Sequence, residues 1–408
     1  MTYEQAKEKL ERCGQEQLLR YYETLSEDGK QNLLTQIDRT DFSVLSNLEH
    51  RGKPQPRGVF APIPVLEAAD IRKEEARFRE EGLKVLRARK AAAVLLAGGM
   101  GTRLGSDNPK GMYDIGETKP VYIFQRLIEN LQDVTREAGN SVRLFIMTSE
   151  KNHDATVSFL KEKQFFGYPE EDVVFFEQDM APACDYDGKV FLEEPGTIAT
   201  SPNGNAGWYL SMKKAGLDTL LHDEGIEWLN VFAVDNVLQR ILDPVFLGAT
   251  VLGQADCGAK VVKKAAPDEA VGVMCLEDNR PSIVEYYELT DAMRDAVNEK
   301  GEPAYNFGVI LNYLFHEPAL ARIADKNLPL HVVEKKIAHI DAEGNPVKPE
   351  KPNGCKFEQL VLDMIHELDS CVVFEVARER EFAPVKNKTG IDSVESARAL
   401  CKQNGIAL

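Results

Sequence analysis

The sequence AAAVLLAGGMGTRLG, residues 91–105, followed by SDNPKGMYDIG, residues 106–116, predicts the fold of the largest part of this chain. Its apolar start, Ala91–Ala97, is typical of a parallel strand that is buried on both faces. Three glycines come next, and they allow a ligand to approach the main chain closely: Gly98, Gly99 and Gly101. Arg103 and Lys110 then supply two cations. Exposed N–H groups beside fixed cations favour a nucleotide-phosphate site at the carboxyl end of the strand.

The glycines alone do not identify a ligand. In the dinucleotide pattern G-x-G-x-x-G the third glycine would come one residue before Gly105. The phosphate-loop pattern G-x-x-x-x-G-K-[ST] also fails, because Lys110 precedes Gly111. The misplaced glycine disfavours a nicotinamide-dependent oxidoreductase. A tight strand-to-helix turn without a ligand stays open as an interpretation of the glycines.

The composition limits the function further. With 408 residues, 43% of them hydrophobic, the chain can form a large core and two or three domains. A net charge of -17 argues against a nucleic-acid partner. The charged start of the chain is unlike a signal peptide and no run approaches a membrane span, so we expect a cytoplasmic protein. The seven cysteines and seven histidines show no zinc-site spacing.

The apolar pattern divides the chain into three parts. Residues 1–64 read as an N-terminal helical segment that ends in a linker, residues 51–64. Residues 65–325 alternate strand and helix patterns, which indicates a mostly parallel sheet with helices on both faces. Residues 326–408 read as a short C-terminal domain. The further strand and helix candidates, in chain order, are strands Arg143–Thr148, Val173–Glu177, Trp228–Val234, Ala259–Val262, Val271–Leu276, Val284–Leu289 and Cys371–Ala377, and helices Tyr122–Leu131, Asp154–Lys163, Trp208–Ala215, Val237–Ile241 and Lys356–Leu368.

Polar residues follow several of these strands. Asp235 comes directly after strand Trp228–Val234, where a carboxylate can hold Mg²⁺ beside a triphosphate or can cap the next helix. Gln178 ends strand Val173–Glu177, where an amide can read the edge of a base or can be an ordinary loop residue. The glycine-bearing loop Ser201–Gly207 fits either a nucleoside or a simple turn.

The whole set of motifs resembles the eukaryotic-type UDP-N-acetylhexosamine pyrophosphorylases and their UDP-sugar relatives. The resemblance begins with LAGGMGTRLG and PKGM in the glycine loop and covers roughly residues 91–390. The other matching segments are Ile146–Ser149, Val174–Ala183, Asp187–Lys189, Pro202–Asn205, Val234–Asn236, Ala255–Val262, Val271–Val273, Val284–Tyr286, Lys351–Gly354 and Glu381–Asn387. It implies an α/β fold with a Rossmann-like, doubly wound mixed sheet of the nucleotidyltransferase, GT-A-like kind.

The resemblance implies a role for each matching residue. The triphosphate would be bound by Arg103 and Lys110, with Lys386 reaching the phosphates from the C-terminal part. The nucleotide would also contact Leu96, Ala97, Gly98, Gly99, Gln178 and Gly204. Mg²⁺ would bind to Asp235. The sugar phosphate would contact Asn205, Gly272, Glu285 and the position of Val309.

The implied reaction joins UTP and N-acetylglucosamine 1-phosphate, giving UDP-N-acetylglucosamine and pyrophosphate reversibly. One departure concerns the sugar: the family string N-A-G-N appears here as Asn306–Val309, with valine in place of the second asparagine. Glucose 1-phosphate or another sugar 1-phosphate is therefore the alternative substrate. A glycosyltransferase that uses UDP-sugar and a non-catalytic nucleotide-binding protein are further alternatives. We expect a monomer, because family members with a longer C-terminal domain sometimes use it for self-association.

Overall fold

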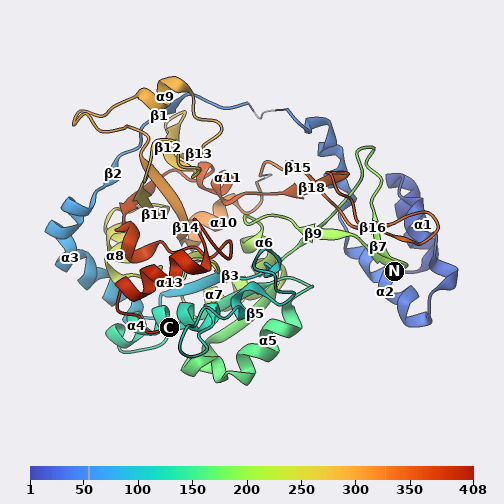
Figure 1. Cartoon of the computed structure of the whole chain (residues 1–408), viewed down its shortest axis with the longest axis horizontal. Helices are drawn as coiled ribbons and strands as arrows, with labels where there is room; N and C mark the ends of the chain where they lie inside the picture. The colour runs from blue at the N-terminus through green and yellow to red at the C-terminus, as the bar shows by residue number, and fades with distance from the viewer. Residues whose placement is uncertain (54–55, 327) are drawn as a thin grey trace. The chain divides into compact units, whose positions relative to one another are not determined.

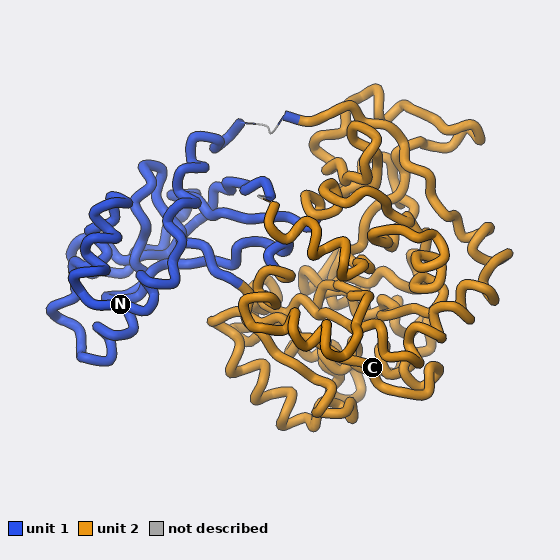
Figure 2. Tube along the Cα trace, turned by 180° about the vertical axis from the view of Figure 1, so that it is seen from behind, with its two compact units in different colours: residues 1–56, 179–207, 327–361 blue, residues 57–178, 208–326, 362–408 orange. Residues whose placement is uncertain are grey.

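The computed structural model describes residues 1–53, 56–326 and 328–408 (Figure 1). The described residues form two compact units, coloured separately in Figure 2. Unit 1 contains residues 1–56, 179–207 and 327–361, and unit 2 contains residues 57–178, 208–326 and 362–408. Part of the predicted linker, residues 54–55, and residue 327 near the predicted domain boundary lie outside the described residues. No helix in the described part is both long and apolar enough to cross a bilayer.

Unit 2 is built on a mixed sheet of 11 strands in the described part of the chain. The main path runs β2 (Val65–Leu66), β19 (Cys371–Glu375), β11 (Cys257–Lys263), β14 (Phe307–His316), β10 (Trp228–Ala233), β3 (Ala91–Leu96), β4 (Leu144–Thr148) and β5 (Val173–Glu177). Strands β10, β3, β4 and β5 are parallel, whereas β14 runs antiparallel to both β10 and β11. The remaining strands are β1 (Phe60–Ala61), β12 (Val273–Glu277) and β13 (Arg280–Val284).

The apolar run at the start of the glycine loop forms β3 near the centre of this sheet. All six of its residues are buried, so the sheet is covered on both faces there. Trp228 of β10 pairs with Ala91, and Ala93 pairs with Leu144 of β4. The expected α/β fold with a doubly wound mixed sheet is confirmed, and parallel neighbours place the carboxyl ends of β10, β3, β4 and β5 at one edge.

Helices connect and cover these strands (Figure 1). They are α3 (Ala68–Arg87), α4 (Ile123–Ala138), α5 (His153–Glu162), α6 (Trp208–Lys214), α7 (Leu217–Asp223), α8 (Pro244–Leu252), α9 (Asp291–Asp295), α10 (Glu317–Ile323), α12 (Arg378–Glu381) and α13 (Val394–Gln403). Helix α11 (Val361–His366) begins at the last residue of unit 1. Helices α3 and α8 pack closely, because a Cβ on Gly82 would come within 1.9 Å of the Pro244 carbonyl oxygen.

Unit 1 combines N-terminal helices with short strands from later parts of the chain. Its helices are α1 (Tyr3–Cys13) and α2 (Glu27–Arg39), and its strands are β6 (Met180–Pro182), β7 (Leu192–Glu194), β8 (Thr197–Ile198), β9 (Thr200–Pro202), β15 (His331–Lys335), β16 (His339–Ile340), β17 (Pro346–Val347) and β18 (Gly354–Glu358). One apolar core joins Leu10 and Leu33 with Val190 and Phe357. This core therefore draws on three separated stretches of sequence.

The structure differs from several sequence predictions. The three consecutive parts, residues 1–64, 65–325 and 326–408, differ from the two discontinuous units, because periodicity does not show which distant stretches share a core. The strand predicted at Val284–Leu289 is wrong, since β13 ends at Val284. The helix predicted at Lys356–Leu368 begins only at Val361, after strand β18. No helix forms at Val237–Ile241, where the chain makes turns before α8.

Candidate active site

The candidate site in unit 2 lies where four parallel strands end. The segment Ala97–Gly99 follows β3, Ser149 follows β4, Gln178 follows β5, and Asp235 lies two residues beyond β10. In open α/β sheets, ligands bind outside the carboxyl ends of such strands. The topology thus brings these four segments, which are far apart in the sequence, to one edge of the sheet.

The glycine loop folds back on itself before it reaches Lys110. The Gly101 N–H donates to the Asn108 carbonyl (2.9 Å), and the Lys110 N–H donates to the Gly99 carbonyl (3.1 Å). Gly105 has φ +65°, a left-handed conformation that suits glycine at this turn. These bonds place Lys110 beside the first glycines rather than eleven residues further along an extended chain.

Two polar residues after β4 hold the carbonyls of the glycine loop. The Ser149 hydroxyl donates to the Gly98 carbonyl (3.0 Å), and Asn152 Nδ2 donates to the Ala97 carbonyl (2.9 Å). In a planar trans peptide the C=O and the following N–H point in opposite directions. The N–H groups of Gly98 and Gly99 are consequently directed away from Ser149 and Asn152, as a phosphate cradle requires.

Lys110 forms the centre of the cationic cluster. Its Nζ lies 3.6 Å from Asp235 Oδ2, and the two side chains are only 16% and 24% exposed. Burial lowers the pKa of Lys110; Asp235 opposes this effect, and the positive charges of Lys386 and Arg103 add to it. The four charged side chains predicted at the phosphates therefore interact electrostatically, with Arg103 exposed to solvent on its 3₁₀ turn.

The chain segment that carries Lys386 is bound to the turn after β10. The Val385 N–H donates to the Asp235 carbonyl (2.9 Å), and the Val237 N–H donates to the Ala383 carbonyl (3.3 Å). Lys386 Nζ is paired with Asp392 Oδ2 at 2.9 Å. These main-chain bonds explain how a lysine near the C-terminus reaches a site defined by β3 and β10.

A buried ion cluster anchors the same segment at its start. The fully buried Lys260 donates from Nζ to Glu381 Oε2 (2.6 Å) and lies 3.4 Å from Asp243 Oδ2. Glu381 in turn accepts at its carbonyl from Asn236 Nδ2 (2.7 Å). Removing one partner of such a cluster leaves a buried charge uncompensated. The cluster thus fixes the position from which the chain leads to Lys386.

Gln178 and Gly98 form a close pair. Gln178 is 7% exposed, and its backbone N–H donates to the Thr148 carbonyl (2.8 Å). A Cβ on Gly98 would lie 2.2 Å from Gln178 Nε2, so only glycine leaves room for this amide. The amide predicted to meet uracil is therefore held against the glycine loop itself.

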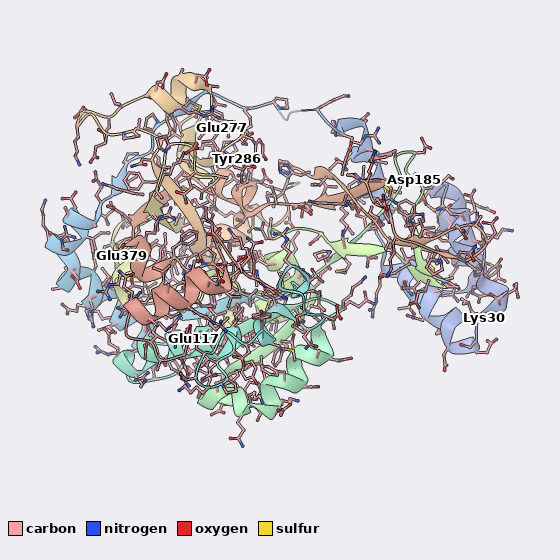
Figure 3. The ribbon with its side chains drawn as sticks, viewed as in Figure 1. Lys30, Glu117, Asp185, Glu277, Tyr286 and Glu379 are labelled. Carbon is pink, nitrogen blue, oxygen red and sulfur yellow. The ribbon has the colours of Figure 1, made fainter. Side chains whose placement is uncertain are left out.

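Three of the four residues predicted at the sugar phosphate lie together within unit 2, around the β12–β13 hairpin. The Val309 N–H donates to the Gly272 carbonyl (2.9 Å). A Cβ on Gly272 would lie 3.4 Å from Glu285 Oε1. Tyr286, labelled in Figure 3, follows Glu285 and is 45% exposed. Gly272, Glu285 and Val309 are thus neighbours, although they come from three different segments.

Gly204 and Asn205 lie in unit 1, unlike the other predicted site residues. Gly204 has φ +91°, and a Cβ there would lie 2.1 Å from the Gln359 carbonyl oxygen. Asn205 Oδ1 accepts from the Val361 N–H (2.8 Å). Both residues of the glycine-bearing loop are therefore tied to the chain around residue 360.

Sequence reasoning missed three residues that the structure places at the glycine loop. Asn152 carries no motif signal, and Ser149 belongs to a matching segment without an implied role. Lys388 is exposed, and its Nζ lies 2.8 Å from where a Cβ on Gly105 would stand. In the sequence, only its place two residues after Lys386 could have indicated a role for Lys388.

A glycine loop with clustered cations at the ends of parallel strands defines a nucleotide-binding α/β protein. The chain belongs to the UTP–glucose-1-phosphate uridylyltransferase family, whose model matches residues 60–407. It is 38% identical to UDP-N-acetylhexosamine pyrophosphorylase-like protein 1 of Mus musculus, across 94% of this chain and 80% of that protein. It is 32% identical to UDP-N-acetylglucosamine pyrophosphorylase of Saccharomyces cerevisiae, across 95% and 87%.

Solved structures of similar proteins have the same fold. The UDP-N-acetylglucosamine pyrophosphorylase of Trypanosoma brucei superposes with a TM-score of 0.81 at 26% identity, covering 96% of this chain and 83% of that one. A protein of Entamoeba histolytica described as a UDP-N-acetylglucosamine pyrophosphorylase gives a TM-score of 0.78 at 30% identity, covering 85% and 88%. The similarity thus extends over both units of the chain.

Proposed function

We propose that this protein is a uridylyltransferase that forms UDP-N-acetylglucosamine and pyrophosphate from UTP and N-acetylglucosamine 1-phosphate. The observation that carries the proposal is the contact of Lys110 with Asp235 beside the glycine loop, with Arg103 and Lys386 in electrostatic range. The named activities of the yeast and trypanosomal relatives support the choice of sugar.

The chemistry suits a site made of cations. The attacking group is a phosphate oxygen of the sugar 1-phosphate, which is already an anion at neutral pH, so no general base is needed. The obstacle is the approach of two anions and the charge that develops on the departing pyrophosphate. Arg103, Lys110 and Lys386 would bind the phosphates in position and offset this charge, while Gln178 would hold the uracil.

Asp235 would hold Mg²⁺ in this proposal. Magnesium typically binds to one or two carboxylates together with substrate phosphates and water, and a single carboxylate beside a phosphate-binding loop fits that pattern. When bound, the ion would supply further positive charge to the phosphate oxygens. Lys110 Nζ lies 3.6 Å from the same carboxylate, so this lysine would stand beside the phosphates that Asp235 and the ion bind.

At the sugar end, the proposal rests on Gly272, Glu285 and Val309. Glu285 can accept hydrogen bonds from sugar hydroxyls, whereas Val309 offers only an apolar side chain and the backbone. Glucose 1-phosphate stays the second candidate because Val309 lacks the amide that the family string carries at this position.

A panel of sugar 1-phosphates tests the proposal. The purified protein is incubated with UTP, Mg²⁺ and N-acetylglucosamine, glucose or galactose 1-phosphate, and pyrophosphate release is measured. We expect the highest kcat/KM with N-acetylglucosamine 1-phosphate. If glucose 1-phosphate reacts faster, it is the substrate in place of N-acetylglucosamine 1-phosphate. Release of free UDP without pyrophosphate would contradict uridylyl transfer altogether.

The assembly and location of the protein are also proposals. We propose a monomer in the cytoplasm, in line with the acidic composition of the chain. Light scattering at working concentrations tests the first statement, and cell fractionation tests the second. A dimer mass, or recovery of the protein with membranes or organelles, would contradict them.

A further inference from the structure

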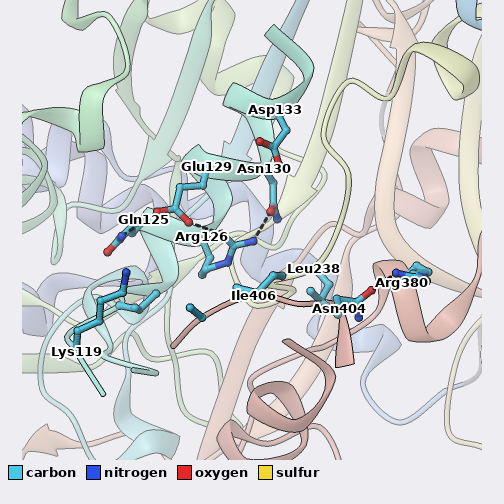
Figure 4. A pocket seen from close by; sticks show the side chains of 12 residues that line it. Lys119, Gln125, Arg126, Glu129, Asn130, Asp133, Leu238, Arg380, Asn404 and Ile406 are labelled. Carbon is cyan, nitrogen blue, oxygen red and sulfur yellow. Dashed lines mark hydrogen bonds and ion pairs between the residues drawn. The ribbon is translucent and has the colours of Figure 1, made fainter. Parts of the chain in front are cut away.

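A polar pocket of about 400 Å³ lies in unit 2, and none of the predicted catalytic residues lines it. Its wall is formed by α4, by the segment around Lys119 and by the chain near Arg380 and Asn404 (Figure 4). The volume is within the range of small-molecule sites. The question is which ligand chemistry its side chains suit.

The pocket is lined by a buried guanidinium whose N–H donors do not all have a hydrogen-bond acceptor. Arg126 is 7% exposed and donates from Nη2 to Asn130 Oδ1 (2.8 Å) and from Nη1 to Glu129. Its Nε is buried, and among the described residues it has no hydrogen-bond partner. A buried N–H without an acceptor costs free energy, so the fold holds this guanidinium in place at a cost.

The guanidinium is held rigidly in this place. Asn130, which accepts from Arg126, donates from Nδ2 to the carbonyls of Val237 (3.0 Å) and Gln239 (3.1 Å). Figure 4 shows Arg126 between the side chains of α4 and those of Leu238 and Ile406. A planar guanidinium fixed by two neighbours is pre-organised for an oxyanion.

The charges that line the pocket leave a positive excess. Of its two carboxylates, Glu129 is paired with Arg126 and Asp133 with Arg136. The exposed cations Lys119 and Arg380 have no carboxylate within ion-pair distance among the described residues, and Arg380 donates to Asn404 Oδ1 (3.0 Å). In a chain of net charge -17, two such cations beside a buried donor mark a local anion site.

We propose that this pocket binds a small phosphate group, either as inorganic phosphate or as part of a phosphorylated metabolite, through Arg126, Lys119 and Arg380. Lys119 and Arg380 bind the phosphate oxygens at the mouth, and the charge of the buried Arg126 guanidinium adds to the positive potential of the pocket. This binding is independent of the proposed uridylyl transfer, because no predicted catalytic residue takes part.

The test first removes two of the cations that are proposed to bind phosphates in the candidate active site. In the Lys110→Ala/Lys386→Ala background, inorganic phosphate and glycerol 3-phosphate are titrated by calorimetry. We expect one saturable site per chain, and at least tenfold weaker binding after Lys119→Ala and Arg380→Ala are added. Binding of both compounds indicates that the phosphate group alone is recognised, whereas binding of glycerol 3-phosphate alone indicates a metabolite.

A control variant and two contrary results make the proposal refutable. Lys73→Ala with Arg77→Ala removes two exposed cations of α3 and should leave the affinity unchanged, which controls for net charge. The proposal is overturned if neither inorganic phosphate nor glycerol 3-phosphate shows saturable binding. Equal affinity with and without Lys119 and Arg380 overturns it as well. Neither result bears on pyrophosphate release by the unmodified protein, which tests the proposed function separately.

Discussion

The phosphate end and the sugar end of the candidate site are held in different ways, although both regions lie in unit 2. The phosphate end follows central strands β3 and β10. Its backbone carbonyls accept hydrogen bonds from the side chains of Ser149 and Asn152 and from the N–H of Val385. The sugar end lies on hairpin β12–β13, where β12 joins β14 at the Val273–Gly308 pair. Glu277 and Tyr286 near this hairpin are labelled in Figure 3. The phosphate end is thus fixed by bonds between separate strands, whereas the sugar end is held by one hairpin and by Arg57, which pairs with Glu277 and Glu288.

The largest effect is expected at the phosphate end, from loss of a cation. Lys110→Ala and Arg103→Ala should each remove about 3 kcal/mol of transition-state stabilisation, roughly 150-fold in kcat/KM, the scale of one preorganised donor. Steady-state rates of pyrophosphate release measure this. Lys7→Ala, which removes an exposed cation of α1 in unit 1, is the control. Near wild-type turnover of both variants would refute the assigned roles.

The second largest effect is a loss of UTP affinity, expected when the space between the glycine loop and Gln178 is filled. Gly98→Ala places a Cβ 2.2 Å from Gln178 Nε2, and such overpacking costs about 2 kcal/mol, or roughly 30-fold in the Kd of UTP. Gly99→Ala is the matched control, because a Cβ there meets nothing within 4 Å. Calorimetric titration with UTP compares the two. Equal losses in both variants would mean that Gln178 is not what the glycine accommodates.

The pH dependence of the rate tests the charge of Lys110. Its pKa is lowered by burial, so the protonated, active form is lost as pH rises through that lowered value. We expect kcat/KM to fall about tenfold for each pH unit above it. Lys110→Arg keeps its charge over the same range and should flatten the profile. An identical alkaline fall in Lys110→Arg would assign the titration to another group.

The smallest effect is expected at the sugar end. Val309→Asn adds an amide beside Gly272 and should favour N-acetylglucosamine 1-phosphate over glucose 1-phosphate by about 1 kcal/mol, roughly fivefold in the ratio of kcat/KM values. Val309→Ala, which adds no polar group, controls for the change in volume. A ratio that stays constant in Val309→Asn would show that the side chain at this position does not contact the sugar.

The same comparison explains what could be predicted from the sequence. The strand Ala91–Ala97 was predictable because a short apolar run followed by glycines has few other interpretations. The place of Asp235 at the end of a central strand was also predictable, because the carboxylate directly follows an apolar run. Asn152, by contrast, contacts the glycine loop only because β3 and β4 are neighbours, and no local pattern carries that information.

Long-range packing accounts for most of the remaining differences. Lys388 reaches Gly105 because the segment around Val385 is bound to the turn at Asp235, which no periodicity reveals. The apolar residues around Phe357 suit either a strand or the start of a helix, and the pairing of this segment with β15 decides the outcome. The propensity of a segment depends on its own residues, whereas the strand with which it pairs is determined by the tertiary fold.

The core of unit 1 has a consequence for the order of synthesis. Leu10 and Leu33 share their core with Phe357, so the first helices are made long before the strand that completes their packing. Domains generally fold from the N-terminus as the chain emerges from the ribosome, at about 5–20 residues per second. At this rate, tens of seconds separate the synthesis of the N-terminal helices from that of the strand that completes their core.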